Sequence, residues 1–212
     1  NSEKPVENIT EILQEITEGI ELGKVYAIKG IGGFHLMCDA KNEKAVAQIR
    51  EIKNRDRKPF AIMASSFDEL RAIASINNTE RELLNSWQRP IVLLKYKGQL
   101  ASGVTNGLNK VGAMLPYMPF HYQLFKRLKT PYLVLTSGNI SDEPILIDND
   151  KALSIFNNQV DDIITYNRDI HNRVDDSVCT LINNTVRINR RSRGYTPQPI
   201  LMNIDAEGIF AS

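Results

Sequence analysis

Apolar positions divide the chain into one amphipathic stretch near its start and a series of short apolar runs farther along. Isoleucine and leucine recur every three or four positions over residues 9–20, which places one apolar stripe on a helix predicted over 6–22. Short, mostly apolar runs bounded by Gly, Pro, Asn or Asp are typical of buried strands. Such runs predict strands at 24–29, 34–40, 60–64, 90–96, 131–137 and 161–167.

Polar residues mark where the helices between these strands begin and end. Asn42 is a suitable N-cap for a helix over 42–54, and Pro59 prevents that helix from continuing. Two short helices follow, each expected to begin at a Ser or Thr cap, and two further helices lie toward the C-terminus. These four predicted helices cover 66–75, 79–86, 115–128 beyond Pro119, and 148–157.

Three further segments, each with Gly or Asn at its turn, complete the outline. Residues 100–114 are predicted as a loop that leads into a brief strand, and residues 30–33 as a tight turn. Residues 179–190 predict a hairpin that turns at Asn183 and Asn184. Helices alternate with strands, but some strands pair as hairpins. We therefore predict an α/β fold with a mixed sheet rather than a purely parallel one.

Composition excludes several classes of protein. The 212 residues fit one large domain or a small pair, and 26 basic residues balance 25 acidic ones to a formal net charge of +1. That balance gives no general attraction to nucleic acid or membranes. No apolar run approaches the ~20 residues that span a bilayer. The two cysteines are too few for a zinc site, and we expect them to be reduced in a cytoplasmic protein.

Cations gather in two places despite the neutral balance. The stretch KNRDRKPFAIM begins at Lys53 and brings four of them close together, and a second group follows the predicted hairpin. The members are Lys53, Arg55, Arg57 and Lys58 in the first cluster and Arg187, Arg190, Arg191 and Arg193 in the second. Each cluster has an ordinary explanation as a solvated face or a helix end. A bound ligand with several negative charges would relieve the repulsion between the cations within each cluster. Spacing alone leaves open whether the two clusters meet.

Small polar side chains follow the strongest predicted strand, in TSGNISDEP at 136–144. Ser137, Asn139 and Ser141 alternate along it, so they could line one wall of a ligand site, as strand ends do in α/β proteins. The alternative is a capping turn. The histidines have no metal-ligand spacing, and no Walker loop is present, so we predict no metal site built by the protein.

Taken in order, six motifs resemble the YrdC-like family. They are KGIGGFHL (29–36), K-x-R-x-x-K-P (53–59), LPYMPFH (115–121), TSGN-x-S-x-EP (136–144), RDI-x-x-R-x-DDSV (168–178) and RR-x-RGY-x-P (190–197). Within that family the chain is similar to the YrdC-like domain of the HypF carbamoyltransferases of nickel–iron hydrogenase maturation. Threonylcarbamoyl-adenylate synthases typically read P-T-E-T-x-Y-G-L where this chain has KGIGGFHL.

The resemblance implies a twisted, open mixed sheet flanked by helices around a positively charged, ATP-binding cavity. It divides the chain into an N-terminal helix or linker (1–22), a YrdC-like domain (23–200) and a linker (201–212) toward a carbamoyl-transfer domain. The implied reaction is adenylation of carbamate, derived from carbamoyl phosphate, with ATP and Mg²⁺. We expect such a fragment to lack the complete carbamoyl transfer. The implied partners are the adjacent domains of a parent chain and a hydrogenase-maturation acceptor protein.

The resemblance also implies roles for individual residues. Lys53 and Arg55 would act on the phosphates as catalytic and nucleotide-binding groups, and Lys29 and Ser141 would hold the small substrate. The remaining nucleotide-binding residues would be Lys58, Ser137, Asn139, Ser177 and Arg191.

Three alternatives stay open at this point. The first is threonylcarbamoyl-adenylate synthesis for tRNA modification. The second is a double-stranded RNA-binding module, because a basic concave surface can hold an RNA backbone as readily as a triphosphate. The third is a scaffold that mainly docks neighbouring domains, and loss of its partners should then expose an apolar patch.

Overall fold

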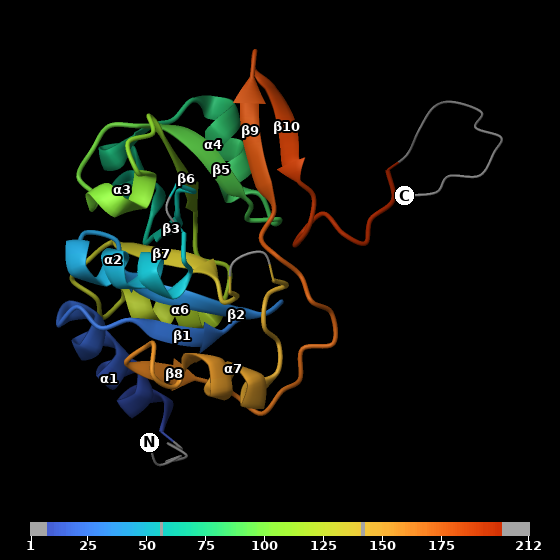
Figure 1. The fold of residues 1–212 in the computed structure, drawn as a ribbon. Helices are drawn as coiled ribbons and strands as arrows, with labels where there is room; N and C mark the ends of the chain where they lie inside the picture. Colours follow the sequence, from blue (N-terminus) through green and yellow to red (C-terminus); the bar gives the residue numbers. More distant parts are fainter. Residues whose placement is uncertain (1–7, 56, 141–142, 201–212) are drawn as a thin grey trace.

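One mixed sheet organises the domain in the computed structural model, which describes residues 8–55, 57–140 and 143–200. Within these residues ten strands join in the order β10-β9-β5-β6-β3-β7-β2-β1-β8, and β4 pairs with the outer part of β5 (Figure 1). Three neighbouring pairs are parallel, namely β1 with β8, β3 with β6 and β5 with β9. The predicted α/β fold with a mixed sheet is therefore confirmed.

The strands alternate with seven helices in the described part of the chain. The strands are β1 (Tyr26–Lys29), β2 (Phe34–Asp39), β3 (Ala61–Ala64), β4 (Ala74–Ser75), β5 (Ile91–Tyr96), β6 (Lys110–Met114), β7 (Tyr132–Ser137), β8 (Asp162–Ile164), β9 (Val178–Ile182) and β10 (Thr185–Arg190). The helices are α1 (Ile9–Glu21), α2 (Glu43–Ile52), α3 (Phe67–Ile73), α4 (Asn78–Asn85), α5 (Ser102–Thr105), α6 (Pro119–Phe125) and α7 (Asn149–Phe156).

Helices cover both faces of the sheet, which explains why strands such as β1, β2 and β7 are buried along almost their whole length without alternation. One face packs on α2, α3, α4, α5 and α7, and the other on α1 and α6. In β7, Val134 points to the first core, whereas Leu133 and Leu135 point to the second. The stripe of α1 enters the second core through Leu13 and Ile16. This amphipathic helix is thus part of the packed domain.

The predicted elements are confirmed except in three details. The N-cap of α4 is Asn77 and not a Ser or Thr, because Asn77 and Glu80 form a reciprocal capping box. The segment 100–114 contains the single-turn helix α5, which ends at Asn106 in the left-handed conformation. The helix predicted over 66–75 ends at Ile73, because Ala74 and Ser75 instead form the two-residue strand β4, which pairs with β5. Among the described residues, no helix is long and apolar enough to cross a membrane.

The hairpin of β9 and β10 forms one end of the sheet, and β8 forms the other (Figure 1). It turns where predicted, since Asn183 and Asn184 both have positive φ angles, of 50° and 59°. The segment between β8 and β9 runs along one side of the molecule and joins the two ends (Figure 1). This segment brings its own polar residues past the turn between β1 and β2.

Candidate functional site

A cavity of about 200 Å³ lies where the end of α2, the end of β7 and the end of β10 meet. We call it the Lys53 cavity. Its lining carries four basic side chains, two carboxylates and two small polar groups. The lining residues are Lys53, Arg55, Lys58, Ser137, Asn139, Glu143, Asp175 and Arg190. Lysines and arginines from the two basic clusters of the sequence therefore share one cavity, with Arg190 representing the second cluster.

Lys53 is the most deeply buried basic group of this cavity. It is the C-cap residue of α2, and only 1% of it is exposed. Its ammonium donates hydrogen bonds to the carbonyl of Ser137, to the carbonyl of Asn139 (3.2 Å) and to Asn139 Oδ1 (2.8 Å). Burial, reinforced by the charge of Arg55 and opposed by Asp175, lowers the pKa of Lys53 to about 7. A basic side chain surrounded by neutral acceptors is thus poised to take up a proton when an anion arrives.

Ser137 and Asn139 are connected to each other as well as to Lys53. The Ser137 hydroxyl donates to Asn139 Oδ1 over 2.8 Å, and Asn139 Nδ2 donates to the carbonyl of Glu143 over 2.5 Å. Gly138 lies between them, where a Cβ atom would stand 2.8 Å from the carbonyl oxygen of Phe34. Only glycine therefore lets the end of β7 approach β2 this closely. These contacts fix the TSGN segment as one wall of the Lys53 cavity.

Arg50 holds the loop that carries Arg55 and Lys58. Its guanidinium, which stacks 4.7 Å over the ring of Phe60, donates to the carbonyls of Arg55 (2.7 Å), Lys58 (3.3 Å) and Gly103. Sequence analysis missed this residue. Its position on the last turn of a helix before a basic loop was the one available signal, and that signal points equally to a helix-end cation.

The opposite wall is fastened by Ser177. Its hydroxyl donates to the carbonyl of Arg193 (2.9 Å) and accepts from the backbone N–H of Ser192 (2.8 Å). The Arg193 N–H also donates to the carbonyl of Asp175. The chain after β10 is thereby joined to the chain before β9, and this junction fixes Asp175 and Arg190 at the rim.

A buried ion pair lies directly behind this wall. Arg193 binds Asp176 through Nε and Nη2, both 2.8 Å from Oδ1, and its guanidinium lies 3.7 Å over the ring of Tyr117. His35 Nε2 lies 3.4 Å from the other oxygen of Asp176. Burial opposes ionisation of Asp176, but the contacts with His35 and Arg193 prevail and hold the pKa of this carboxyl well below its usual range.

His121 packs against the same cluster. Its ring makes an edge contact with Tyr117, with ring centroids 4.7 Å apart, and its Nδ1 atom has no hydrogen-bond partner among the described residues. Burial lowers the pKa of His121 to about 3, and the neighbouring His35 acts in the same direction. His121 is therefore a neutral core residue at physiological pH.

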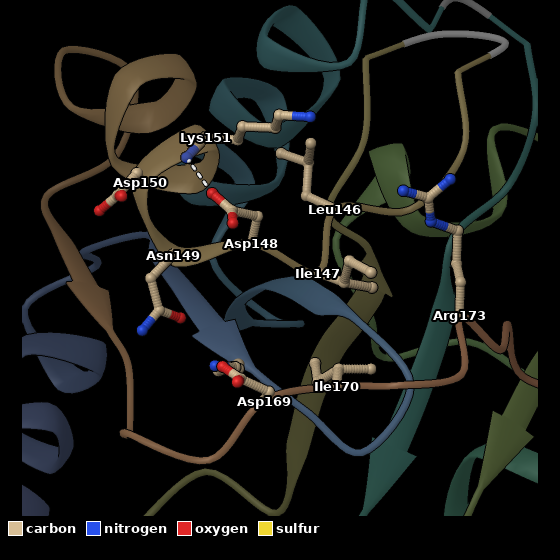
Figure 2. Close-up of a pocket in the computed structure, with 10 residues that line it drawn as sticks. Leu146, Ile147, Asp148, Asn149, Asp150, Lys151, Asp169, Ile170 and Arg173 are labelled. Carbon is tan, nitrogen blue, oxygen red and sulfur yellow. Dashed lines mark hydrogen bonds between the residues drawn. The ribbon is translucent and has the colours of Figure 1, made fainter.

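The other predicted site residues lie elsewhere. Arg191 does not line the Lys53 cavity, and its guanidinium donates to the carbonyl of Gln198. Ser177 is fully buried in the junction just described. Lys29 lines a different cavity, of about 490 Å³ (Figure 2). Ser141 lies outside the described residues. The predicted positive charge of the Lys53 cavity stays a prediction, because Glu143 and Asp175 share its lining with the cations.

The turn between β1 and β2 contacts the segment that contributes residues to both cavities. The N–H of Val174 donates to the carbonyl of Gly32 over 3.0 Å, and a Cβ atom on Gly32 would stand 2.2 Å from the Val174 carbonyl oxygen. Arg173 lines one cavity and Asp175 the other. The contact at Gly32 therefore sets the position of one short segment that serves both cavities.

The chain is similar in sequence to one protein family and to several curated proteins. Residues 18–192 match the family profile Sua5_yciO_yrdC, described as "Telomere recombination". The chain is 39% identical over 207 residues to carbamoyltransferase HypF of Rhizobium leguminosarum bv. viciae, covering 94% of this chain and 27% of the relative. It is 42% identical over 194 residues to carbamoyltransferase HypF of Synechocystis sp., covering 91% and 25%. The chain thus spans about a quarter of the length of these curated relatives.

Two further comparisons bear on the site. A threonylcarbamoyl-AMP synthase of Pseudoalteromonas atlantica is 33% identical over 144 residues, covering 65% of this chain and 76% of the relative. A crystal structure of full-length HypF, in a phosphate- and nucleotide-bound form, superposes with a TM-score of 0.87 and 44% identity, covering 94% of this chain and 31% of that one.

Proposed function

This chain belongs to the Sua5/YciO/YrdC family, and we propose that its Lys53 cavity binds the phosphates of ATP while the domain adenylates carbamate for a carbamoyl transfer. The observation that carries the proposal is the buried Lys53 ammonium. It stands beside Arg55, Lys58 and Arg190 in one cavity and is held by Ser137 and Asn139. The similarity to HypF carbamoyltransferases supports the choice of reaction.

The size of the cavity supports a phosphate site in particular. A volume of about 200 Å³ is below the roughly 300–1,000 Å³ of pockets that enclose whole drug-sized ligands. Phosphate oxygens fit it, because ammonium and guanidinium groups form short, charge-assisted hydrogen bonds with them. A nucleoside would extend beyond the cavity. The relative solved in a phosphate- and nucleotide-bound form is consistent with such a guest.

In the proposed reaction a carbamate oxygen attacks the α-phosphorus of ATP, the bond to the bridging oxygen breaks, and pyrophosphate leaves. Positioning and charge neutralisation account for most of the catalysis of such transfers. Lys53 would enter this reaction protonated, since contact with phosphate raises the pKa that burial has lowered. Arg55 and Lys58 would neutralise the departing pyrophosphate.

Mg²⁺ fits this site as a companion of the phosphates. In the part of the chain that the structure describes, no three His, Cys, Asp or Glu side chains are grouped to hold a metal ion. Glu143 and Asp175 offer two carboxylates at the cavity, which suits an ion that keeps most of its water and binds mainly through phosphate oxygens. When bound, Mg²⁺ would supply further neutralisation of the triphosphate charge.

Threonylcarbamoyl-adenylate synthesis is the second candidate, favoured by the identity to the synthase of Pseudoalteromonas. The higher identity to HypF proteins, over more of this chain, favours carbamate as the acid. Nothing in the fold or the comparisons supports the double-stranded RNA alternative.

A pyrophosphate-exchange assay tests the proposal. The 212-residue chain is incubated with ATP, Mg²⁺ and labelled pyrophosphate, and the label is followed into ATP. We expect exchange that depends on carbamate, supplied as ammonium bicarbonate, and is lost in Lys53→Met. Exchange that instead requires bicarbonate together with threonine would support the second candidate. Absence of exchange with either substrate, despite bound ATP, would contradict adenylation by this chain.

A further inference from the structure

Two walls of the Lys53 cavity belong to strands that do not pair with each other. Ser137 and Asn139, at the end of β7, form the TSGN wall. Asp175, before β9, and Arg190, at the end of β10, form the hairpin wall. In the sheet β5, β6 and β3 lie between β9 and β7, and each step from strand to strand spans roughly 4.8 Å (Figure 1). Because variation in twist accumulates over these strands, contacts that cross directly between the walls are needed to fix their separation.

His35 makes such a contact with Asp176. In the antiparallel register of β2 and β7, His35 is the partner of Ser137 in the TSGN wall. Its Nε2 atom lies 3.4 Å from Asp176 Oδ2, and the two residues are only 5% and 8% exposed. The other edge of the ring packs against Gly30, where a Cβ atom would stand 2.8 Å from His35 Nδ1. His35 thus joins the TSGN wall to the chain that enters β9.

Asp176 transmits this contact to Arg190. Its second carboxylate oxygen, Oδ1, binds the guanidinium of Arg193, which follows β10. The next residue, Ser177, forms hydrogen bonds with the backbone after β10, and Val178 is the strand partner of Arg190. The backbone of Asp176 and the end of β10 are therefore fastened together on both sides of Arg190. A displacement of Asp176 would carry Arg190 with it.

Arg190 depends on this support because β10 is a weak anchor. Every residue of β10 is exposed, and its pairing with β9 shifts in register between Ile188 and Arg190. An edge strand with an interrupted ladder opens more readily than a central strand. Lys53, in contrast, is 1% exposed and is held by hydrogen bonds to the TSGN wall. The position of Arg190 relative to Lys53 thus relies on the contact between Asp176 and His35.

We propose that His35 is a positioning residue of the Lys53 cavity: through Asp176 it holds the hairpin wall at the separation at which Arg190 and Lys53 contact one polyphosphate. His35 does not line the cavity, and its loss would leave both cations present but farther apart. The separation of the walls is independent of the reaction, whereas its effect on ATP binding rests on the function proposed above.

Electron paramagnetic resonance measures the separation of the walls without a ligand. Nitroxide labels are attached to Glu51→Cys on α2 and to Asn189→Cys on β10, because both positions are exposed and neither lines the cavity. The native thiols of Cys38 and Cys179 are buried, so the labels react at the two introduced positions. We expect one narrow distance distribution when His35 is present.

Substitutions then show whether His35 sets that separation. His35→Phe keeps a ring but removes its nitrogen atoms, and we expect a longer or broader distance distribution. His35→Asn, whose amide is too short to reach Asp176, should have the same effect and provides the test if His35→Phe does not fold. His35→Gln keeps an N–H donor at a similar reach and should preserve the narrow distribution. His171→Phe, the same change at an exposed residue, should preserve it too. A distribution that is unchanged in His35→Phe and His35→Asn, or changed equally in His171→Phe, would overturn the proposal.

Calorimetric titration with ATP tests the consequence for binding. His35→Phe should weaken ATP binding about tenfold when Arg190 is present but less than about twofold in Arg190→Met, because the effect of His35 is carried by Arg190. Equal losses with and without Arg190 would show that His35 does not act through this arginine and would overturn the proposal. If the wild-type chain bound no ATP, the nucleotide proposal would fail, and the label distances would still decide the role of His35.

Discussion

The ammonium of Lys53 lies 2.8 Å from Oδ1 of Asn139, a residue 86 positions later in the chain. Lys53 ends the helix after β2, and Asn139 follows β7, the strand paired with β2. The antiparallel pairing of His35 with Ser137 brings these two regions together. Three hydrogen bonds from Lys53, two to Asn139 and one to the carbonyl of Ser137, thus connect the first basic cluster to the TSGN wall.

Removing cations from the Lys53 cavity should weaken ATP binding. We expect Lys53→Ala and Arg55→Ala each to cost about 1.5–3 kcal/mol of binding free energy, the usual range for hydrogen bonds to charged groups. Isothermal titration measures this loss. Arg57→Ala is the matched control, because Arg57 belongs to the same cluster but is exposed and does not line the cavity. A loss in Arg57→Ala equal to the other two would mean that only the overall charge matters.

The lowered pKa of Lys53 predicts proton uptake on binding. With the cavity empty this pKa is about 7, so the amine is mostly neutral at pH 8, and bound phosphate raises its pKa. ATP affinity should therefore fall roughly tenfold per pH unit above pH 8, where the phosphates have already lost their protons.

Calorimetry in two buffers of different ionisation enthalpy counts the proton. We expect about one proton taken up per ATP at pH 8.5 and none in Lys53→Met. Equal uptake by both proteins would assign the proton to another group.

Asn139 should matter for stability as well as for binding. Asn139→Ala leaves the Lys53 ammonium and the Ser137 hydroxyl without a shared acceptor, so we expect a loss of about 1–3 kcal/mol in the free energy of unfolding. Urea denaturation measures it. Asn85→Ala, at an exposed helix end, should stay within about 0.5 kcal/mol of the wild type. A comparable loss of unfolding free energy in both variants would show that the shared hydrogen bonds of Asn139 do not stabilise the fold more than an exposed asparagine does.

Replacing the carboxylate of Asp176 should lower the free energy of unfolding more than replacing an exposed carboxylate does. Asp176→Asn leaves the mostly buried guanidinium of Arg193 without its counter-ion, and we expect a cost of about 3–5 kcal/mol at pH 7. Asp169→Asn, at an exposed carboxylate, should cost less than about 0.5 kcal/mol.

Acid should remove the contribution of Asp176 in the wild type. The folded pKa lies below the unfolded one, so this stability is complete above the unfolded pKa near 3.8 and is lost progressively as the pH falls toward the folded value. Unfolding free energies measured from pH 6 downward should therefore converge for the wild type and Asp176→Asn. If the unfolding free energies of the two proteins instead fell in parallel with pH, the ion pair of Asp176 would not be the cause of the loss of stability in acid.

Sequence patterns predicted the sheet, its helices and the two basic clusters, because each depends on local spacing. They could not predict which arginine of the second cluster faces Lys53. A register shift in the pairing of β9 and β10 between Ile188 and Arg190 changes the direction of the side chains that follow. Arg190 lines the cavity, and Arg191 turns toward Gln198. The burial of Lys53 was equally hidden, since its acceptors lie more than eighty positions away.

The cap of α4 is different, because its signal was present in the sequence. Asn77 stands three residues before Glu80, which is the spacing of a capping box. The separation of Lys29 from Lys53 had no local signal. The two lysines line cavities that share no residue, and the close approach of Gly32 to Val174, residues far apart in the chain, had no local signal either.

The junction of Ser177 with Ser192 and Arg193 has a consequence for biosynthesis. The ribosome makes every strand from β1 to β8, and both cores around them, before it reaches Arg190. A nascent chain can therefore bury most of its apolar surface while the Lys53 cavity still lacks one wall. The Lys53 cavity is complete only after the hairpin of β9 and β10 has docked beside β5 and Ser177 has bonded to the chain that follows β10.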